Sequence, residues 1–285
     1  MRADLGGKTI VITGGSSGIG AAAARAVRQM GARVVITGRS QRTRTLADEI
    51  GGDHYLVDYS RFSDVRGFAQ ALLERYHRID VLVNNVGGVI ARRRITPDGH
   101  EMTLQVNHLS GFLLTNLLRR RLEESNAVVI NTSSAANRFG HIDFDDLERE
   151  RHYGAFRAYG TAKLMNILHA IEISRRFEGV SAASFHPGNV ATGFAREGSA
   201  IFKLIYETPL KHLFLISPEK GAGTLLWLIA GEPGRDWTPG EYYDKRKPAR
   251  KNRQVSSSVA QQLWEASERL IGVEQAVPGV PRLVE

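Results

Sequence analysis

The sequence contains no cysteine among its 285 residues. This absence excludes disulfide bonds, thiolate-bound metals and a cysteine nucleophile. Long hydrophobic runs are also missing, because the longest candidates, 213–216 and 225–230, fall far short of the ~20 apolar residues that a membrane-spanning helix needs. The first ten residues have no apolar stretch of the kind that a signal peptide requires. We therefore expect a cytoplasmic protein with no membrane span and no metal site.

Acidic residues are in the minority, with 30 Asp and Glu against 38 Lys and Arg, which gives a net charge of +8. A basic balance indicates affinity for anions, and nucleic acid is one such partner. The basic residues are dispersed, however, and their small clusters at 92–94, 119–121 and 245–247 are not interleaved with aromatic side chains. We therefore expect no nucleic-acid partner, and we expect a few arginines to meet a phosphorylated cofactor.

Short apolar, β-branched segments alternate with segments of helical periodicity along most of the chain. Strands are expected at 9–13, 33–37, 53–57, 81–84, 127–132 and 180–185, and helices at 19–30, 42–50, 65–76, 104–121 and 158–177. Strands separated by helix-length segments imply right-handed crossovers and a parallel sheet. The sequence thus predicts an α/β fold, a doubly wound parallel sheet of about seven strands with helices on both faces. No linker divides it, so we expect one domain over 1–273 and a C-terminal tail over 274–285.

A glycine-rich turn lies between the first expected strand and the first expected helix, within 13–20. Glycine in this position permits a tight turn and close approach of the backbone to a pyrophosphate, which the N-terminus of the helix then holds. The spacing Gly-x3-Gly-x-Gly differs from the Gly-x-Gly-x2-Gly form. The turn predicts a dinucleotide site, and its candidate cofactor-binding residues are Gly14, Ser16, Ser17, Gly18, Ile19 and Gly20.

The second expected strand ends in Gly38 and Arg39. An NAD site usually places a carboxylate near this position to bind the ribose 2′-hydroxyl. No carboxylate stands here, and the planar fork of arginine suits a 2′-phosphate. Arg39 therefore favours NADP(H) over NAD, with Arg42 in a position to help; the alternative is an ordinary surface arginine.

Tyr159 and Lys163 are four residues apart in the last of the expected helices, in which Leu164, Ile167 and Leu168 recur at the spacing of one buried face. Residues at this spacing share a helix face. A positive charge beside a phenol lowers its pKa toward the working range of a general acid or base. The same spacing also occurs by chance in many helices, so the pair needs the context of the other motifs.

In combination, these motifs resemble the short-chain dehydrogenase/reductase family from about residue 8 to 192, and more weakly to about 243. The resemblance implies a Rossmann fold with a catalytic set made of Asn107, Ser134, Tyr159 and Lys163. It also implies further cofactor contacts from Asp58, Tyr59, Asn85, Val86, Gly87, Tyr159, Lys163, Pro187, Gly188, Val190 and Thr192. Val86 departs from the Asn-Asn-Ala-Gly form of the family motif. Each position has a simpler reading: Ser133 or Ser134 could cap a turn, Asp58 could cap a helix, and Asn107 could be a satisfied buried amide.

The interval from Ser134 to Tyr159 spans 25 residues, longer than the dozen or so common in the family. Its segment 139–147 is similar to the retinol-dehydrogenase-like branch, which includes oxidoreductases with WW domains. That likeness implies a bulky apolar alcohol or carbonyl substrate, such as a retinoid, steroid or other lipid. Substrate contacts are expected from Ser134, Phe194 and Phe202 within a binding region over 194–240, although the apolar residues there could equally pack on the core.

Two other functions remain compatible with the sequence. A ketoreductase of polyketide-like secondary metabolites would share every catalytic residue. A non-catalytic, NADP-sensing interaction protein could use the same fold, since fold does not determine function. Family members often form homodimers or homotetramers through the helices that carry Asn107 and Tyr159, and the resemblance leaves such an assembly open here.

Overall fold

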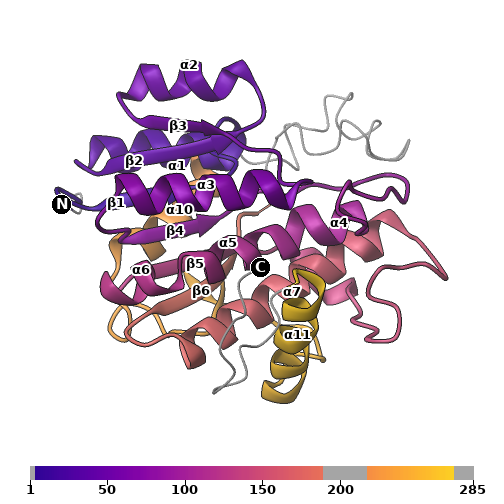
Figure 1. Cartoon of the computed structure of the whole chain (residues 1–285). Helices are drawn as coiled ribbons and strands as arrows, with labels where there is room; N and C mark the ends of the chain where they lie inside the picture. The colour runs from indigo at the N-terminus through magenta and orange to yellow at the C-terminus, as the bar shows by residue number, and fades with distance from the viewer. Residues whose placement is uncertain (1–3, 189–216, 273–285) are drawn as a thin grey trace, which may run out of the picture.

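The computed structural model describes residues 4–188 and 217–272. These residues form an eight-stranded sheet with the order β3-β2-β1-β4-β5-β6-β7-β8 (Figure 1). The strands are β1 (Thr9–Ile12), β2 (Arg33–Gly38), β3 (Asp53–Leu56), β4 (Val81–Asn84), β5 (Val128–Thr132), β6 (Ser181–His186), β7 (Tyr242–Asp244) and β8 (Lys247–Pro248). Neighbours from β3 to β7 all pair in parallel, and the direction of winding reverses between β1 and β4. The predicted doubly wound parallel sheet is therefore confirmed.

The sheet has one strand more than the seven or so that the sequence predicts. β8 contains only two residues and pairs antiparallel with β7, through Tyr243 with Pro248 and Asp244 with Lys247. The connecting Lys245 and Arg246 both adopt positive φ, at 50° and 64°. A two-residue strand is too short to create a periodic pattern in the sequence, which explains why it is not visible there.

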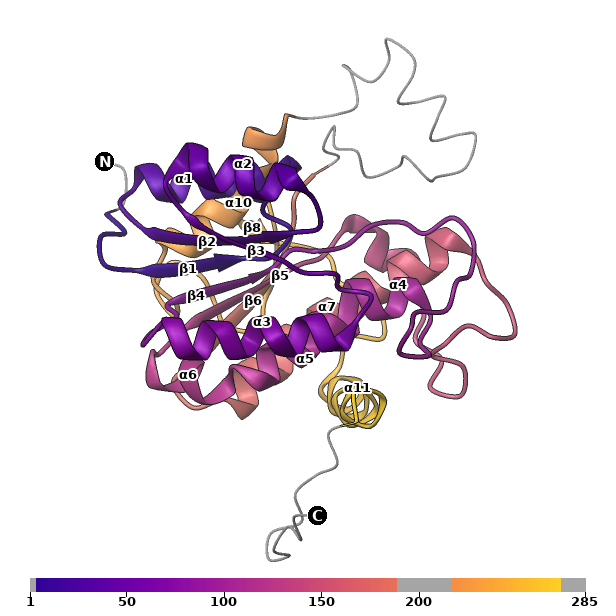
Figure 2. The same ribbon diagram turned by 45° about the horizontal axis from the view of Figure 1, so that its top comes forward.

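Helices cover both faces of the sheet (Figure 2). One face carries α1 (Gly18–Gln29), α2 (Gln41–Ile50) and α10 (Pro218–Ala230). The other carries α3 (Phe62–Arg75), α5 (Ser110–Leu117), α7 (Ala155–Arg176) and α11 (Ser257–Leu270). Successive residues of a strand point to opposite faces, so Ile10 and Ile12 pack in the first layer whereas Val11 packs in the second.

The expected helix over 104–121 is interrupted in the structure. It consists of α4 (Met102–Leu104), a π-turn η1 (Gln105–Leu109), α5 and α6 (Arg119–Glu124). A π-turn adds one residue to the helical repeat and is frequent at functional sites. Hydrophobic spacing predicts a helix but cannot reveal one added residue. The interruption matters because Asn107 lies in the middle of η1.

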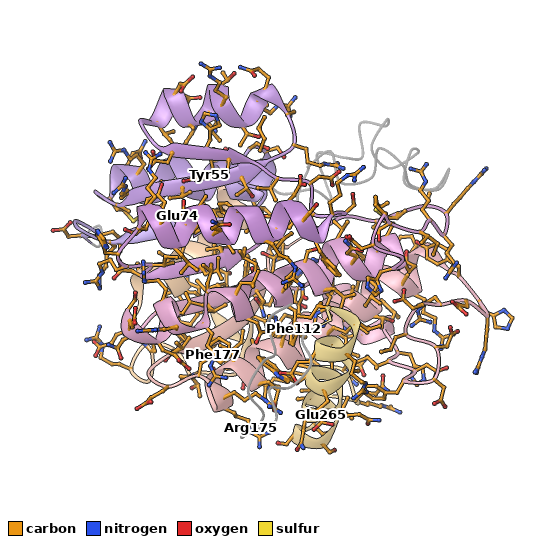
Figure 3. All side chains as sticks on the ribbon, viewed as in Figure 1. Tyr55, Glu74, Phe112, Arg175, Phe177 and Glu265 are labelled. Atoms are coloured by element: carbon orange, nitrogen blue, oxygen red, sulfur yellow. The ribbon has the colours of Figure 1, made fainter. Side chains whose placement is uncertain are left out.

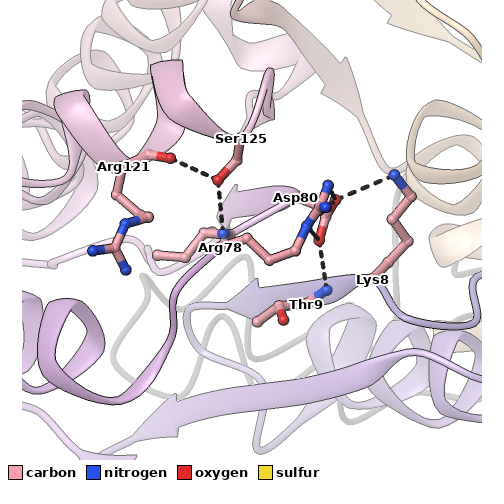
Figure 4. Close-up of polar contacts among 7 residues, drawn as sticks. Lys8, Thr9, Arg78, Asp80, Arg121 and Ser125 are labelled. Atoms are coloured by element: carbon pink, nitrogen blue, oxygen red, sulfur yellow. Dashed lines mark hydrogen bonds and ion pairs between the residues drawn. The ribbon is translucent and has the colours of Figure 1, made fainter.

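The amino ends of the strands are fixed by a buried carboxylate, Asp80, just before β4 (Figure 4). Its oxygens accept hydrogen bonds from the Thr9 backbone amide at 2.8 Å, from Lys8 Nζ at 3.2 Å and from the Arg78 guanidinium. Burial raises the pKa of Asp80, but the bonds from Arg78, Thr9 and Lys8 outweigh burial and hold it below its usual value. These contacts stabilise the edge at which the strands begin. The predicted site lies at the opposite edge, where the strands end.

Two long connections project together beyond the carboxyl edge of the sheet, namely 85–101 and the 140–154 insert before α7 (Figure 2). Tyr153 Oη donates to the Ile90 carbonyl at 2.7 Å, and His100 Nδ1 pairs with Glu148 Oε1 at 2.7 Å. The hydrogen bond that His100 donates to Glu148 raises the pKa of His100. The insert that distinguishes the sequence is therefore tied to the loop that follows β4.

The last described helix, α11, lies across α7 (Figure 1). Its Trp264 meets the Phe112 ring of α5 edge-on at 4.7 Å and approaches Phe177 at 5.9 Å. The predicted assembly through the helices that carry Asn107 and Tyr159 stays a prediction, and α11 covers part of the surface of α7 that it would use. Within the described ranges, no helix is long and apolar enough to span a membrane.

Candidate active site

The glycine turn connects β1 to α1 in the conformation that the sequence predicts. Gly14 and Gly18 adopt positive φ, at 64° and 52°, and a Cβ on Gly20 would collide with the Gly14 carbonyl oxygen. Ser17 is the N-cap residue of α1, but its side chain makes no capping bond, and the first turn of α1 contains no acidic residue. The amide groups at this helix end are therefore available to an anionic ligand, as a pyrophosphate site requires.

The end of β2 lies directly beside this turn. A Cβ on Gly38 would come within 2.6 Å of Ser16 Oγ, so a larger residue would force the Ser16 side chain to move. Arg39 follows, exposed and without an ion pair among the described residues. Its side chain is thus available at the end of β2, one residue after the contact between Gly38 and Ser16.

Asp58 and Tyr59 occupy the loop after β3. Asp58 Oδ1 accepts bonds from the Ser60 amide at 3.0 Å and from Ser60 Oγ at 2.8 Å, so the carboxylate shapes a turn and does not cap α3. Tyr59 was predicted to contact the cofactor, but its phenol is buried and shares a 2.8 Å hydrogen bond with Thr37 Oγ1. Its carbonyl accepts a bond from Ser110. The structure therefore places both polar groups of Tyr59 toward the core.

Thr13 connects the glycine turn to the segment after β4. Its hydroxyl accepts the Asn85 amide at 2.8 Å and the Val86 amide at 3.2 Å. Asn85 Nδ2 donates to the carbonyl oxygens of Thr13 and Gly14, and its Oδ1 accepts from Thr132 at 3.2 Å. The ends of β1, β4 and β5 are thereby held in one rigid group at the carboxyl edge of the sheet.

Tyr159 and Lys163 share one face of α7, as the sequence predicts. Lys163 Nζ lies 5.5 Å from the centre of the Tyr159 ring and donates to the Thr132 carbonyl at 3.1 Å. Both residues are buried, with Lys163 only 1% exposed. Burial lowers the pKa of Lys163 to about 7. Burial therefore weakens the positive charge that the sequence places beside the phenol.

Asn107 is held in the π-turn by its own side chain. Its Oδ1 accepts the Gly88 amide, and its Nδ2 donates to the Gly88 and Thr103 carbonyl oxygens, all at 3.0 Å. Its backbone carbonyl accepts a 3.1 Å bond from Asn166 Nδ2. The side chain is thus a satisfied buried amide, as the simpler reading supposed, and the backbone carbonyl is the group directed at Asn166.

Gly87 separates Asn107 from Lys163. A Cβ at this position would overlap Asn107 Oδ1 and would lie 2.8 Å from Lys163 Nζ. No larger residue fits without displacing both groups.

Replacing Gly87 by alanine is therefore expected to lower kcat about tenfold or more, because Lys163 must move away from Tyr159. Gly88→Ala is the matched control, since a Cβ there has no neighbour within 4 Å. Steady-state kinetics of the two variants, at equal folded concentration, test the expectation. Equal activity in both would show that the contact at Gly87 is unimportant.

The two serines after β5 have different roles. Ser133 is buried, and its hydroxyl donates to the Lys163 carbonyl at 2.7 Å. Ser134 is partly exposed, and its Oγ accepts the Ala136 amide at 3.2 Å as the cap of the short helix η2 (Ala135–Phe139). Ser134 can cap η2 and also contact a substrate, because its side chain is partly exposed. Ser133 is buried and cannot contact a substrate.

The segment after β6 contributes a turn whose first residues are described. Gly188 adopts a positive φ of 82° after Pro187. His186 Nδ1 accepts the amide of Ala135, next to Ser134, at 3.3 Å. The predicted contacts Val190, Thr192, Phe194 and Phe202 lie outside the described residues. Of the expected substrate region, the described residues from 217 onward begin with α10, which packs against α1.

The sequence motifs do not identify Thr13, Thr132, Asn166 or His186 as site residues. Thr132 acts through its carbonyl and Thr13 through bonds between strand ends, and neither leaves a pattern in the sequence. Asn166 did leave a signal, because it is a polar residue between Leu164 and Ile167 on a helix that is otherwise apolar at these positions.

Comparison with known proteins agrees with this geometry. The family model described as short chain dehydrogenase matches residues 8–200. A predicted daunorubicin C-13 ketoreductase from Streptomyces sp. (strain C5) is 43% identical over 277 residues, which cover 94% of both chains. Human retinol dehydrogenase 13 is 35% identical over 289 residues, which cover 96% of this chain and 87% of that protein.

Solved structures of other proteins have a similar fold. An uncharacterised protein from Mycobacterium paratuberculosis superposes with a TM-score of 0.77 at 28% identity, over 96% of each chain. A Pseudomonas aeruginosa protein solved as an NADP active-site complex has a TM-score of 0.65 at 25% identity, over 84% of this chain and 94% of that one.

Proposed function

Because the chain belongs to the short-chain dehydrogenase family of oxidoreductases, we propose that it interconverts an alcohol and a ketone or aldehyde on a bulky apolar substrate, with NADP(H) as hydride carrier. The observation that carries the proposal is the placement of Tyr159 beside Lys163, with Ser134 accessible on the neighbouring strand end. All three lie at the carboxyl edge of the sheet, on the same side as the glycine turn. Ligands of doubly wound sheets bind at this edge.

The residues at this edge divide the chemistry between them. Ser134 donates a hydrogen bond to the substrate oxygen and polarises its bond to carbon. Tyr159 donates its phenolic proton to that oxygen in reduction and removes the proton in oxidation. Lys163 lowers the pKa of the adjacent phenol and holds the ribose, and Asn107 completes a water relay to Lys163. When bound, the nicotinamide supplies or accepts the hydride.

Three features of the chain support NADP(H). The free amide groups of α1 suit a pyrophosphate, and the exposed Arg39 at the end of β2 suits a 2′-phosphate. The end of β2 carries no carboxylate that would favour NAD.

Two substrate classes follow from the relatives. The retinol dehydrogenases favour a retinoid or similar lipid, and the insert tied to the loop after β4 matches that branch. The ketoreductase relative is more similar, at 43% identity, and favours a secondary-metabolite ketone of polyketide type. A non-catalytic NADP sensor is the weakest alternative, because it would have no need for Ser134, Tyr159 and Lys163.

A substrate panel tests the proposal. Oxidation of NADPH and of NADH is measured with retinal, a ketosteroid, daunorubicin and a small aldehyde, using the purified full chain. We expect turnover with at least one bulky carbonyl and faster turnover with NADPH. A preference for retinal or for daunorubicin decides between the two classes. Tight NADPH binding without turnover of any carbonyl would overturn the oxidoreductase proposal in favour of a sensor.

A further inference from the structure

One amide connects the carbonyl group that accepts from Lys163 to a carbonyl group of the π-turn. Asn166 Nδ2 donates to the Asn107 carbonyl of the π-turn at 3.1 Å and to the Thr132 carbonyl of β5 at 3.1 Å. The Thr132 carbonyl is also the acceptor for Lys163 Nζ. Asn166 lies three residues after Lys163 on α7 and is 5% exposed. The same helix therefore carries the ammonium group and the amide that holds its acceptor in place.

The direction of each hydrogen bond in this group is determined by chemistry. Because carbonyl oxygens can only accept hydrogen bonds, the NH₂ group of Asn166 must face both carbonyls. Its Oδ1 therefore points to His108 Nδ1 at 3.4 Å. His108 then donates from Nδ1 and accepts at Nε2, where Ser267 Oγ lies at 3.0 Å. A neutral imidazole has one donor and one acceptor, and burial lowers the pKa of His108 to about 4, which keeps the ring neutral.

Aromatic packing encloses this group on the side of α11. Phe112, beside α11 in Figure 3, lies 5.9 Å from the His108 ring and 4.7 Å from Trp264. His108 and Ser267 are each 1% exposed. Asn166, His108 and Ser267 are thus nearly inaccessible to bulk water, so bulk water does not replace a hydrogen bond that is lost here.

From these contacts we propose that Asn166 is a positioning residue for the reaction, which ties the Asn107 carbonyl to the Thr132 carbonyl and so fixes the Thr132 acceptor of the Lys163 ammonium beside Tyr159. His108 and Ser267 orient the amide from behind, so that α11 contributes to the site without contacting the substrate. The inference rests on the proposed function, because it concerns the proton-transfer group of that reaction.

The decisive variant is Asn166→Leu, which has a similar size and no donor. We expect kcat to fall about 10- to 100-fold, as for the loss of two buried hydrogen bonds at a reacting group. The KM for NADPH should change much less. The pH midpoint of alcohol oxidation should move upward, because a less firmly held ammonium lowers the pKa of the phenol less effectively. A merely structural role would not move that midpoint.

Ile167→Val is the matched control, since Ile167 is the next residue of α7 and is fully buried in its apolar core. It should leave both kcat and the pH midpoint unchanged. Asn166→Ser, a milder variant that retains one donor, covers the case in which the leucine variant does not fold; it should shift both quantities in the same direction by less.

Urea unfolding and the KM for NADPH, measured on the same samples, separate the outcomes. A fall in kcat that only follows the folded fraction, with an unmoved pH midpoint, would overturn the inference, and so would unchanged kinetics. Each of these results leaves the proposed function intact, because the parent protein still turns over. An inactive parent protein contradicts the proposed function itself.

Discussion

Tyr159→Phe is expected to lower kcat by about 10²–10⁴-fold, the usual worth of a positioned general acid or base. The reason is that the Tyr159 hydroxyl, one helical turn from Lys163 on α7, has no replacement at that position among the described residues. Phenylalanine keeps the ring and its packing, so the affinity for NADPH should stay close to that of the parent protein. Stopped-flow reduction of the best carbonyl from the substrate panel, together with NADPH fluorescence titration, measures the two effects separately.

Tyr76→Phe is a suitable control for the loss of a hydroxyl. Tyr76 is buried and donates from Oη to Asp53 at 2.8 Å, near the amino end of β3 and far from the carboxyl edge. This variant is expected to lose some stability and no activity per folded molecule. Full activity in Tyr159→Phe, or an equal loss in both variants, would contradict the assignment of Tyr159 as the proton-transfer residue.

The sequence predicts the fold well because the fold depends on repeated, local patterns. Alternating apolar strands and helices, with a glycine turn between β1 and α1, are sufficient to predict that the strands around β1 pair in parallel. The prediction that Tyr159 and Lys163 share a helix face is confirmed for the same reason, because it depends on one helix alone.

What the sequence could not predict depends on contacts between distant segments. The π-turn at Asn107 adds a single residue to a helix, and hydrophobic spacing tolerates that addition. The role of Asn166 requires β5, η1 and α7 to meet, which no local pattern encodes. Tyr59 stands next to a family motif, yet its phenol faces Thr37 in the core. A position next to a motif therefore does not by itself predict the direction in which a side chain points.

Lys163 is the residue for which the sequence and the structure imply different electrostatics. The sequence suggests a permanent cation, whereas burial lowers the pKa of Lys163 to about 7, against about 10.4 for a free lysine. An amine with a depressed pKa in the folded state destabilises the fold wherever it must carry its charge. That cost is complete below pH 7 and vanishes as the pH rises toward 10.4, because there the unfolded chain also loses the proton.

Lys163→Met is therefore expected to abolish turnover and to stabilise the protein, most strongly at low pH. The difference between these two pKa values corresponds to an upper limit of about 5 kcal/mol at pH 6, reduced by the lost bond to Thr132. At pH 9.5 the gain should fall to about 1 kcal/mol or less. Urea unfolding without cofactor at both pH values measures it, with the exposed Lys220→Met as the control for removal of a lysine. A destabilised variant at pH 6, or an equal gain at both pH values, would show that Lys163 does not pay a desolvation cost in the fold. The expected pattern instead means that the protein gives up stability to keep a cation beside Tyr159.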